Sequence, residues 1–292
     1  LDKNLLKGPR TVVKLITNSG LASDNNRTNV LLLGTGGPGH DGPDLSDTMI
    51  LASVDEDGRD VALVSIPRDL WLPALKAKVN AVYQIGLSQD NGLGLAKVVM
   101  GNILGIPIHY ALRVDFRGFV KAIDTVDGID VLVEKSFDDF EYPIQGKEND
   151  LCGYTEKEME FSEEEAKKLN IDPGKQKVLI APDGAIATDS AQEDKGTAYF
   201  SCRYEQISFD KGLTQMNGAI ALKYVRSRHG TNGEGSDFAR SVRQEKVLNA
   251  MRNKILSVET LFNPEKISDL IKTLDKSVDT DISTKDAFEF YK

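Results

Sequence analysis

A glycine-rich segment between two apolar runs gives the first constraint on the fold. Residues 29–49 read NVLLLGTGGPGHDGPDLSDTM and contain the pattern G-x-G-x-x-G at Gly34, Gly36 and Gly39. In a dinucleotide-binding loop, the last glycine opens a helix inside a strand–helix–strand unit. Here Pro38 and Pro43 interrupt that helix, and only about ten residues remain before the next apolar run, barely enough for a crossover. We therefore predict a loop that simply joins two strands.

The spacing of apolar residues predicts alternating strands and helices. Strands are expected at residues 30–33, 49–54, 61–66, 108–114 and 129–133. Helices are expected at residues 93–104, 116–123, 214–225 and 237–257, the first of them stopped by Gly105 and Pro107. Asp57-Gly58 predicts a hairpin between the second and third strands. Because a hairpin interrupts the alternation, the sheet should be mixed, with helices on its faces.

Changes in composition suggest the domain boundaries. Residues 1–28 are predicted to form an N-terminal arm and linker, residues 29–262 the main α/β domain, and residues 263–292 a C-terminal helical extension packed on that domain. Residues 134–212 are rich in Glu, Lys, Asp and Gly and show weak periodicity. This pattern predicts an irregular insertion within the main domain.

The insertion holds both cysteines of the chain, Cys152 and Cys202. Their spacing is not that of a metal site such as C-x-x-C. They are either two free thiols or one disulfide, and we favour the disulfide. Such a bridge would stabilise the fold by about 4 kcal/mol in the chain-entropy model, and it would indicate an oxidising, extracytoplasmic location.

The charge of the chain argues against a nucleic-acid partner. Its 292 residues carry a net charge of −9, whereas nucleic-acid binders usually present a basic surface. Arginines gathered in an acidic chain are therefore informative. Arg68 follows the third predicted strand, at the end where open α/β sheets place ligands, although a surface ion pair with Asp69 explains it as well. Four more arginines lie within residues 222–244: Arg226, Arg228, Arg240 and Arg243.

The second half of residues 222–244 is a predicted helix with charged groups on its apolar face. At about 3.6 residues per turn, one face carries Asp237, Arg240, Gln244, Leu248, Met251 and Ile255. Buried charges are costly unless they are paired, so these groups either form a structural network or line a site. Arginine suits the bidentate binding of phosphate, and Asp47 offers a carboxylate to a divalent cation. We favour a phosphate site.

Several segments, taken in order, resemble the LytR-CpsA-Psr family of cell-envelope phosphotransferases. The matching segments are Ser46–Met49, Ser65–Asp69, Lys78–Ala81, Val114–Phe119, Asp127–Ile129, Ala221–Arg228 and Asp237–Gln244. No single segment decides the match, but their order and spacing fit over roughly residues 29–260.

The resemblance implies a three-layer α/β/α sandwich around a central mixed sheet. It also implies an enzyme on the extracytoplasmic face of the plasma membrane, anchored by an N-terminal helix that this chain does not contain. The family transfers a glycopolymer from a polyprenyl-diphosphate carrier to peptidoglycan or a comparable envelope acceptor. No nucleic acid takes part.

The resemblance further assigns the site residues. The phosphate-binding candidates are Arg68, Lys78, Arg226, Arg228, Arg240 and Gln244, and the arginines among them, with Asp237, are the catalytic candidates. Asp47 matches an aspartate associated with Mg²⁺ or a similar divalent cation. In the expected reaction, an acceptor hydroxyl attacks the sugar-linked phosphorus while Asp237 or Asp47 orients or deprotonates it.

Two positions depart from the family pattern. Gly36 stands where the family commonly has Asp, and Leu45 stands where it commonly has Arg. The magnesium site must then use a substitute, or only Asp47 and the diphosphate itself. The candidate substitutes are His40, Asp41 and Asp44.

Three other functions fit the same residues. A diphosphatase would use water as its acceptor, a non-catalytic protein would only bind prenyl phosphate or anionic glycopolymer, and a structural protein would pair its arginines with its many carboxylates. Two further residues lie close to the candidates in sequence. Trp71 is expected to pack rather than to stack on a sugar, and His229 is a weaker candidate for phosphate binding.

Overall fold

The structure is a computed structural model that describes residues 20–187, 199–255 and 277–291. The chain divides into two compact units. The first unit consists of Leu1–Val133, Gly212–Arg226 and Ser241–Lys292, and the second of Glu134–Lys211 and Ser227–Arg240. The first strand begins at Arg27 and so takes the last two residues of the predicted linker, while residues 1–19 of the predicted arm lie outside the described ranges.

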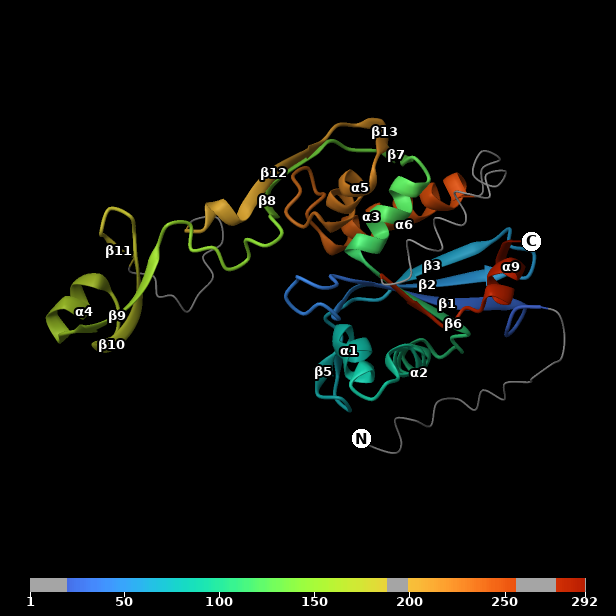
Figure 1. The fold of residues 1–292 in the computed structure, drawn as a ribbon, viewed down its shortest axis with the longest axis horizontal. Coiled ribbons are helices and arrows are strands. Elements are labelled where there is room, and N and C mark those ends of the chain that lie inside the picture. Colours follow the sequence, from blue (N-terminus) through green and yellow to red (C-terminus); the bar gives the residue numbers. More distant parts are fainter. Residues whose placement is uncertain (1–19, 188–198, 256–276, 292) are drawn as a thin grey trace. The chain divides into compact units, whose positions relative to one another are not determined.

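A mixed five-stranded sheet forms the centre of the first unit (Figure 1). Its strands, in spatial order, are β14 (Val278–Thr280), β6 (Tyr110–Asp115), β1 (Arg27–Thr35), β2 (Ser46–Asp55) and β3 (Val61–Ser65). Strands β1 and β6 are parallel, and the other neighbours are antiparallel. The glycine-rich loop connects β1 directly to its antiparallel neighbour β2, with Gly34 opposite Thr48. A dinucleotide-binding loop is thereby excluded, because no helix follows it.

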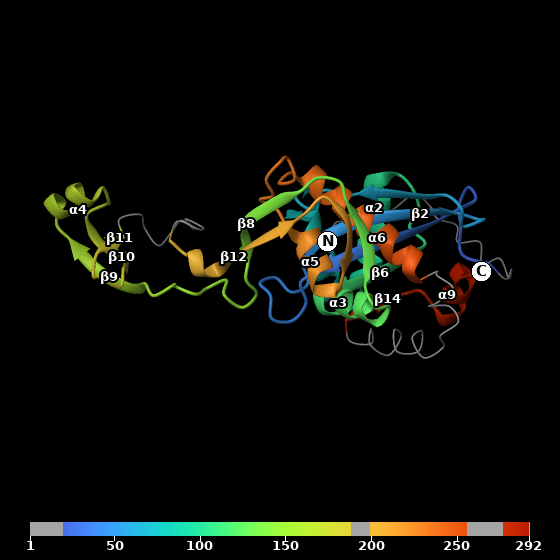
Figure 2. The ribbon, with the colours of Figure 1, turned by 90° about the horizontal axis from the view of Figure 1, so that it is seen from above.

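Helices cover both faces of this sheet and complete the three predicted layers (Figure 1; Figure 2). One face carries α1 (Val82–Leu87) and α2 (Gly92–Leu104), and the other carries α3 (Phe116–Thr125), α5 (Gly218–Arg226) and α6 (Asp237–Ile255). Helix α2 ends at Gly105, whose φ of 71° suits glycine, as its sequence predicts. Within the described ranges, we find no helix with both the length and the apolar character needed to cross a bilayer.

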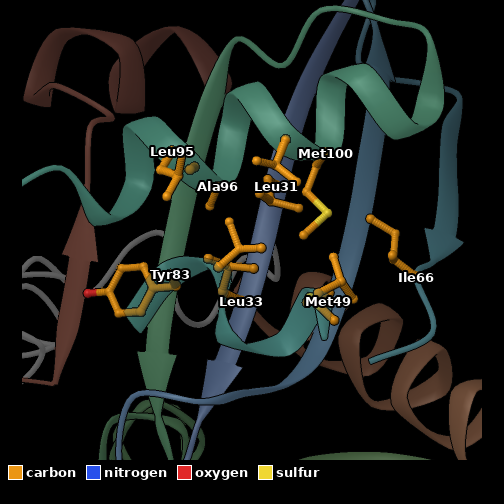
Figure 3. Packing of buried hydrophobic residues seen from close by; sticks show 12 residues of the cluster. Leu31, Leu33, Met49, Ile66, Tyr83, Leu95, Ala96 and Met100 are labelled. Atoms are coloured by element: carbon orange, nitrogen blue, oxygen red, sulfur yellow. The ribbon is translucent and has the colours of Figure 1, made fainter. Parts of the chain in front are cut away.

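The main core lies between the sheet and helices α1 and α2 (Figure 3). Leu31 and Leu33 of β1 and Met49 of β2 pack against Leu95 and Met100 of α2, and all five are buried. Alternate residues of a strand face opposite sides of the sheet, so a sheet covered on both faces needs a continuous apolar run. Burying a side chain of this size stabilises the fold by about 1.5–3 kcal/mol.

The C-terminal segment supplies a strand as well as a helix. Strand β14 pairs with β6 at the sheet edge, and helix α9 (Thr284–Tyr291) follows. The Ser283 hydroxyl accepts a hydrogen bond from the Asp286 backbone N–H at 3.1 Å, which caps the start of the helix. The extension is therefore not wholly helical. A three-residue strand is too short to show an alternating pattern.

The inserted segment contains more regular structure than its sequence predicts. In the first unit, β7 (Ile129–Val133) pairs with β13 (Gly212–Met216). The second unit contains β8 (Phe137–Pro143) paired with β12 (Tyr204–Phe209), and a sheet of β9 (Thr155–Phe161), β10 (Gly174–Ile180) and β11 (Ile186–Ala187) beside helix α4 (Glu163–Leu169). Most residues of β9 are exposed, so polar residues fill both of its faces and the alternating signal is lost.

Cys152 and Cys202 form a disulfide within the second unit, which confirms the favoured pairing. Replacing both with serine should lower the free energy of unfolding of this unit by about 4 kcal/mol in the chain-entropy model. Amide hydrogen exchange across β9 and β10 measures the change, with reduced wild-type protein as the matched comparison. Equal protection in the double variant and the oxidised wild type would contradict this prediction.

Candidate active site

Asp47 and Arg68 meet at one end of the β2–β3 pair. Ile50 of β2 lies opposite Ser65 of β3, so the start of β2 and the end of β3 lie at the same end of the strand pair. The Arg68 Nη1 donates to Asp47 Oδ1 at 2.5 Å. Both side chains are partly exposed, at 27% for Arg68 and 39% for Asp47. The antiparallel register thus brings together two of the predicted site residues, 21 positions apart in the chain.

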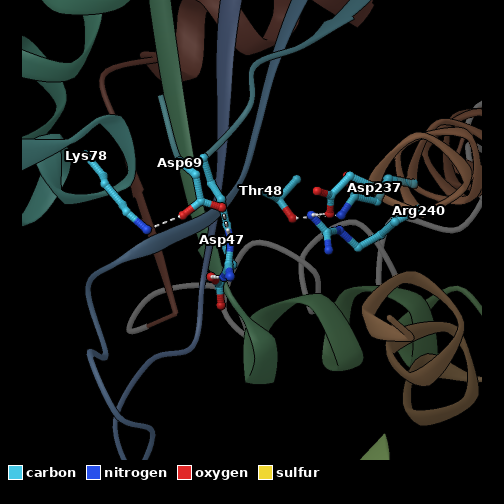
Figure 4. Close-up of polar contacts among 8 residues, drawn as sticks. Asp47, Thr48, Asp69, Lys78, Asp237 and Arg240 are labelled. Carbon is cyan, nitrogen blue, oxygen red and sulfur yellow. Dashed lines mark hydrogen bonds and ion pairs between the residues drawn. The ribbon is translucent and has the colours of Figure 1, made fainter. Parts of the chain in front are cut away.

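The ion pair continues into a row of alternating charges (Figure 4). Arg68 Nε lies 3.4 Å from Asp69 Oδ2, and Lys78 Nζ donates to Asp69 Oδ1 at 2.6 Å. The hydrogen bond from Lys78, aided by the positive charge of Arg68, holds the pKa of Asp69 below its ordinary value. We call Asp47, Arg68, Asp69 and Lys78 the charged row. Both of its cations are predicted phosphate ligands, and both have carboxylate partners.

A short hairpin fixes the backbone of the charged row. Strands β4 (Trp71–Leu72) and β5 (Ala77–Lys78) pair with each other, and the Asn80 N–H donates to the Arg68 carbonyl at 3.2 Å. The prediction that Trp71 packs is wrong, because its side chain is 56% exposed. Its neighbour Leu72 packs against the main core instead, as alternation along a strand requires.

Gln244 of α6 reaches the residue next to Asp47. Its Nε2 donates to Thr48 Oγ1 at 3.0 Å, which joins the helix to β2 (Figure 4). Thr48 lies opposite Gly34, and a Cβ at position 34 would come within 3.1 Å of the Thr48 Cβ. The glycine therefore leaves room for the threonine side chain. Gln244 is placed beside the charged row by this contact.

Arg226, at the end of α5, lies over an aromatic ring that contacts the glycine-rich loop. Its guanidinium sits 4.3 Å from the centre of the Phe116 ring, and the edge of that ring contacts His40 at a centroid distance of 5.1 Å. A cation over an aromatic face is stabilised by the ring quadrupole. Arg226 thus joins the loop, Phe116 of α3 and α5 in one cluster of the first unit.

The other predicted site residues belong to the second unit. Arg240 Nη2 lies 2.7 Å from Asp237 Oδ1, while His229 Nδ1 lies 3.3 Å from Glu141 Oε2. Arg228 follows α5 directly, and its backbone N–H donates to Asp139. That Arg228, Asp237 and Arg240 act on the same phosphate as Arg68 stays a prediction.

The inward orientation predicted for Asp237 is wrong, because its side chain is 83% exposed. The buried residues of α6 are instead Arg243 and Val247. Arg243 is 1% exposed, and its Nε donates to the Tyr224 carbonyl at 2.9 Å. The aliphatic stem of an arginine can extend an apolar face. The helix is therefore rotated relative to the face that its aliphatic residues suggest.

The residues around Asp47 suit a magnesium ion only if phosphate completes its ligand set. Among the described residues, the one group of three His, Cys, Asp or Glu ligands is Asp150, Cys152 and Cys202, and its cysteines are bridged. Near Asp47 itself, the buried Ser46 hydroxyl has no hydrogen-bond partner in the structure. Such hard oxygen donors, few in number, are what Mg²⁺ accepts when phosphate and water supply the rest.

The candidate substitutes for the missing aspartate are engaged or remote from this role. A Cβ at Gly36 would come within 2.9 Å of the His40 Cβ, so His40 occupies the space beside position 36. Asp44 lies 3.5 Å from the buried Arg113, and Asp41 is exposed. Asp47 is also paired, with Arg68 at 2.5 Å, so its choice as the metal ligand rests on the family resemblance.

The LytR_cpsA_psr family profile matches residues 8–292. The chain belongs to this family. A relative named polyisoprenyl-teichoic acid–peptidoglycan teichoic acid transferase TagV, from Bacillus subtilis, is 26% identical over 230 residues, which cover 77% of this chain and 42% of the relative. The family assignment agrees with the segments that carry the sequence resemblance.

Solved structures of similar proteins share the fold of this family member. The crystal structure of B. subtilis TagV matches with a TM-score of 0.54 and 24% identity, covering 92% of this chain and 79% of that one. A structure described as TagT bound to LI-WTA matches with a TM-score of 0.52 and 19% identity, covering 91% and 74%. The chain spans about half the length of the curated relatives it matches, from 42% to 56% for TagV and a TagU of Bacillus licheniformis.

Proposed function

We propose that this protein is a phosphotransferase that moves a glycopolymer phosphate from a polyprenyl-diphosphate carrier to a hydroxyl group of peptidoglycan or a similar envelope acceptor. The observation that carries the proposal is the pairing of Arg68 with Asp47 where β2 begins and β3 ends. Relatives named as polyisoprenyl-teichoic acid–peptidoglycan teichoic acid transferases support the choice of donor and acceptor.

The reaction joins the acceptor oxygen to the sugar-linked phosphorus. The bond from that phosphorus to the bridging oxygen breaks, prenyl phosphate leaves, and the acceptor proton passes to a carboxylate, Asp237 or Asp47. Arg68 exchanges Asp47 for phosphate oxygens, while Arg226 keeps its place over Phe116 and adds positive charge. A fixed cation such as Arg226 would stabilise the charge of the transition state without reorganising, whereas Arg68 must first release Asp47.

A divalent cation, Mg²⁺ or similar, completes the proposal. Asp47 would hold it, and the ion would neutralise diphosphate charge and make the prenyl phosphate a better leaving group. An Asp47 carboxylate that held the metal would no longer compete for Arg68, so metal binding would favour binding of the diphosphate by Arg68. Lys78 would likewise have to release its partner, Asp69, before it could bind phosphate.

Residues of the second unit extend the proposed set of phosphate ligands. Arg228 and Arg240 would add two further guanidinium groups, and Gln244 would add a neutral donor. Gln244 lies one turn beyond Arg240 on the same helix, so both side chains emerge from one face of α6. Asp237 is exposed, which suits a group that must meet an incoming acceptor hydroxyl.

The extracytoplasmic face of the plasma membrane is the proposed location. The disulfide between Cys152 and Cys202 supports it, because such bridges persist in oxidising compartments. A prenyl-linked donor also requires a membrane, to which an N-terminal anchor would hold the protein.

A transfer assay with three readouts tests the proposal. Purified protein is incubated with a labelled polyprenyl-diphosphate glycopolymer and Mg²⁺, with and without peptidoglycan fragments as acceptor. We expect labelled polymer on the acceptor, prenyl phosphate as the second product, and little reaction without acceptor. Equal release of phosphate-terminated polymer without acceptor would indicate a diphosphatase instead. Retained binding of the donor without turnover would indicate a non-catalytic binding protein.

A further inference from the structure

The segment that carries Arg228 is bound along one edge of strand β8. Asn232 Nδ2 donates to the Ser136 carbonyl at 2.8 Å. Thr231 and Asp138 then exchange two hydrogen bonds, from Thr231 N to Asp138 O at 2.8 Å and from Asp138 N to Thr231 Oγ1 at 2.9 Å. The other edge of β8 pairs with β12. Residues 231 and 232 therefore hold this segment against the start of β8, without adding a strand to the β8–β12 pair.

The same segment also contacts Asp139 of β8, whose carboxylate is completely buried. Its Oδ2 accepts hydrogen bonds from the Ser227 hydroxyl at 2.6 Å, the Arg228 N–H at 3.1 Å and the His229 N–H at 3.2 Å. Its Oδ1 accepts from the Glu141 N–H at 2.9 Å. Burial alone would raise the pKa of Asp139, but these hydrogen bonds, led by that of Ser227, outweigh burial and hold its pKa below the ordinary value.

A buried charge is costly, so its position calls for a physical reason. Three of the four donors to Asp139 come from consecutive residues, 227–229, and two of these donors are backbone N–H groups. Two successive N–H groups that converge on one oxygen restrict the backbone dihedral angles between them. The carboxylate thereby fixes the direction in which the Arg228 side chain leaves the backbone.

We infer that Asp139 is a positioning residue for Arg228: it acts through the backbone of residues 227–229 to hold the guanidinium ready for phosphate. The inference rests on the proposed function, because phosphate binding by Arg228 is part of that function. It also gives the inserted segment a role in positioning Arg228, since Asp139 lies on β8, the first strand of the second unit.

Binding of inorganic pyrophosphate by calorimetry tests the inference. Asp139→Asn keeps the shape of the side chain but replaces one acceptor oxygen with a donor, and we expect about tenfold weaker binding. Asp138→Asn is the matched control, because that carboxylate accepts from Ser208 of β12 and not from residues 227–232. The control should bind within about twofold of the wild type. Ser227→Ala, which removes one donor and leaves the carboxylate in place, should weaken binding in the same direction by a smaller factor.

A double-mutant cycle separates positioning from general structural damage. If Asp139 acts through Arg228, Asp139→Asn should cost little further affinity once Arg228→Ala is present. Additive losses, or wild-type affinity in Asp139→Asn, would overturn the inference while leaving the proposed function intact. A wild-type protein that does not bind pyrophosphate would instead contradict the proposed function, and the inference with it.

Discussion

Arg68→Ala should slow glycopolymer transfer by about 100-fold or more, the usual cost of removing one donor that stabilises a transition state. The variant also leaves Asp47 and Asp69 facing an incoming diphosphate without the cation between them. Arg68→Lys should fall between the two, because lysine keeps the charge but cannot form two parallel hydrogen bonds. The ratio kcat/KM in the transfer assay measures the effect.

Arg59→Ala is the matched control for Arg68. Arg59 is an exposed arginine in the turn between β2 and β3, at the opposite end of the same strand pair. Its removal changes the net charge equally but should leave the rate within about twofold of the wild type. A loss of activity shared by both variants would point to charge or stability, and full activity in Arg68→Ala would remove Arg68 from the mechanism.

Asp47→Asn should raise the Mg²⁺ concentration needed for half-maximal transfer by at least about 10–100-fold, since even residues behind a metal ligand have effects of that size. The same variant should bind pyrophosphate more tightly than the wild type when no metal is present, because Arg68 then lacks its competing carboxylate. Opposite changes with and without metal distinguish this account from simple loss of structure. Titration of Mn²⁺ by electron paramagnetic resonance, with pyrophosphate present, follows metal binding without relying on activity.

Asp60→Asn controls for the loss of an ion-paired aspartate. Asp60 pairs with Arg27 at 2.8 Å, at the far end of the same strands, and has no role in the proposed site. It should leave the Mg²⁺ dependence unchanged. If Asp47→Asn responds to metal as the Asp60 variant does, the cation is held elsewhere.

The fold of the first unit could be predicted because local signals and long-range packing agree there. The run at residues 30–33 is apolar on both faces, as a strand covered by helices on both sides requires, and Gly105 ends α2 in a conformation that suits glycine. The site residues Asp47 and Arg68 could be predicted to meet because a hairpin signal, Asp57-Gly58, sets the register between their strands. The resemblance to the family came from the order and spacing of several segments, which no single segment provides.

The features that could not be predicted from the sequence depend on long-range contacts rather than on the local residue pattern. Strands β8 and β9 are rich in polar residues, so nothing in their spacing distinguishes them from irregular chain. The burial of Arg243 could not be predicted, because its guanidinium is satisfied by the Tyr224 carbonyl, 19 residues away in the chain. Asp139 lay within a segment predicted to be irregular, and three of its four donors come from the distant residues 227–229, with only the fourth from its own strand.

Native mass spectrometry with a polyprenyl diphosphate tests most directly whether Arg68 and its neighbours bind a lipid-borne diphosphate. The wild-type protein and the Arg59→Ala control should each form a one-to-one complex with this lipid, and Arg68→Ala should lose it. A wild type that forms no complex, or an Arg68→Ala variant that retains the lipid as fully as the wild type, would contradict this role of Arg68 and its neighbours.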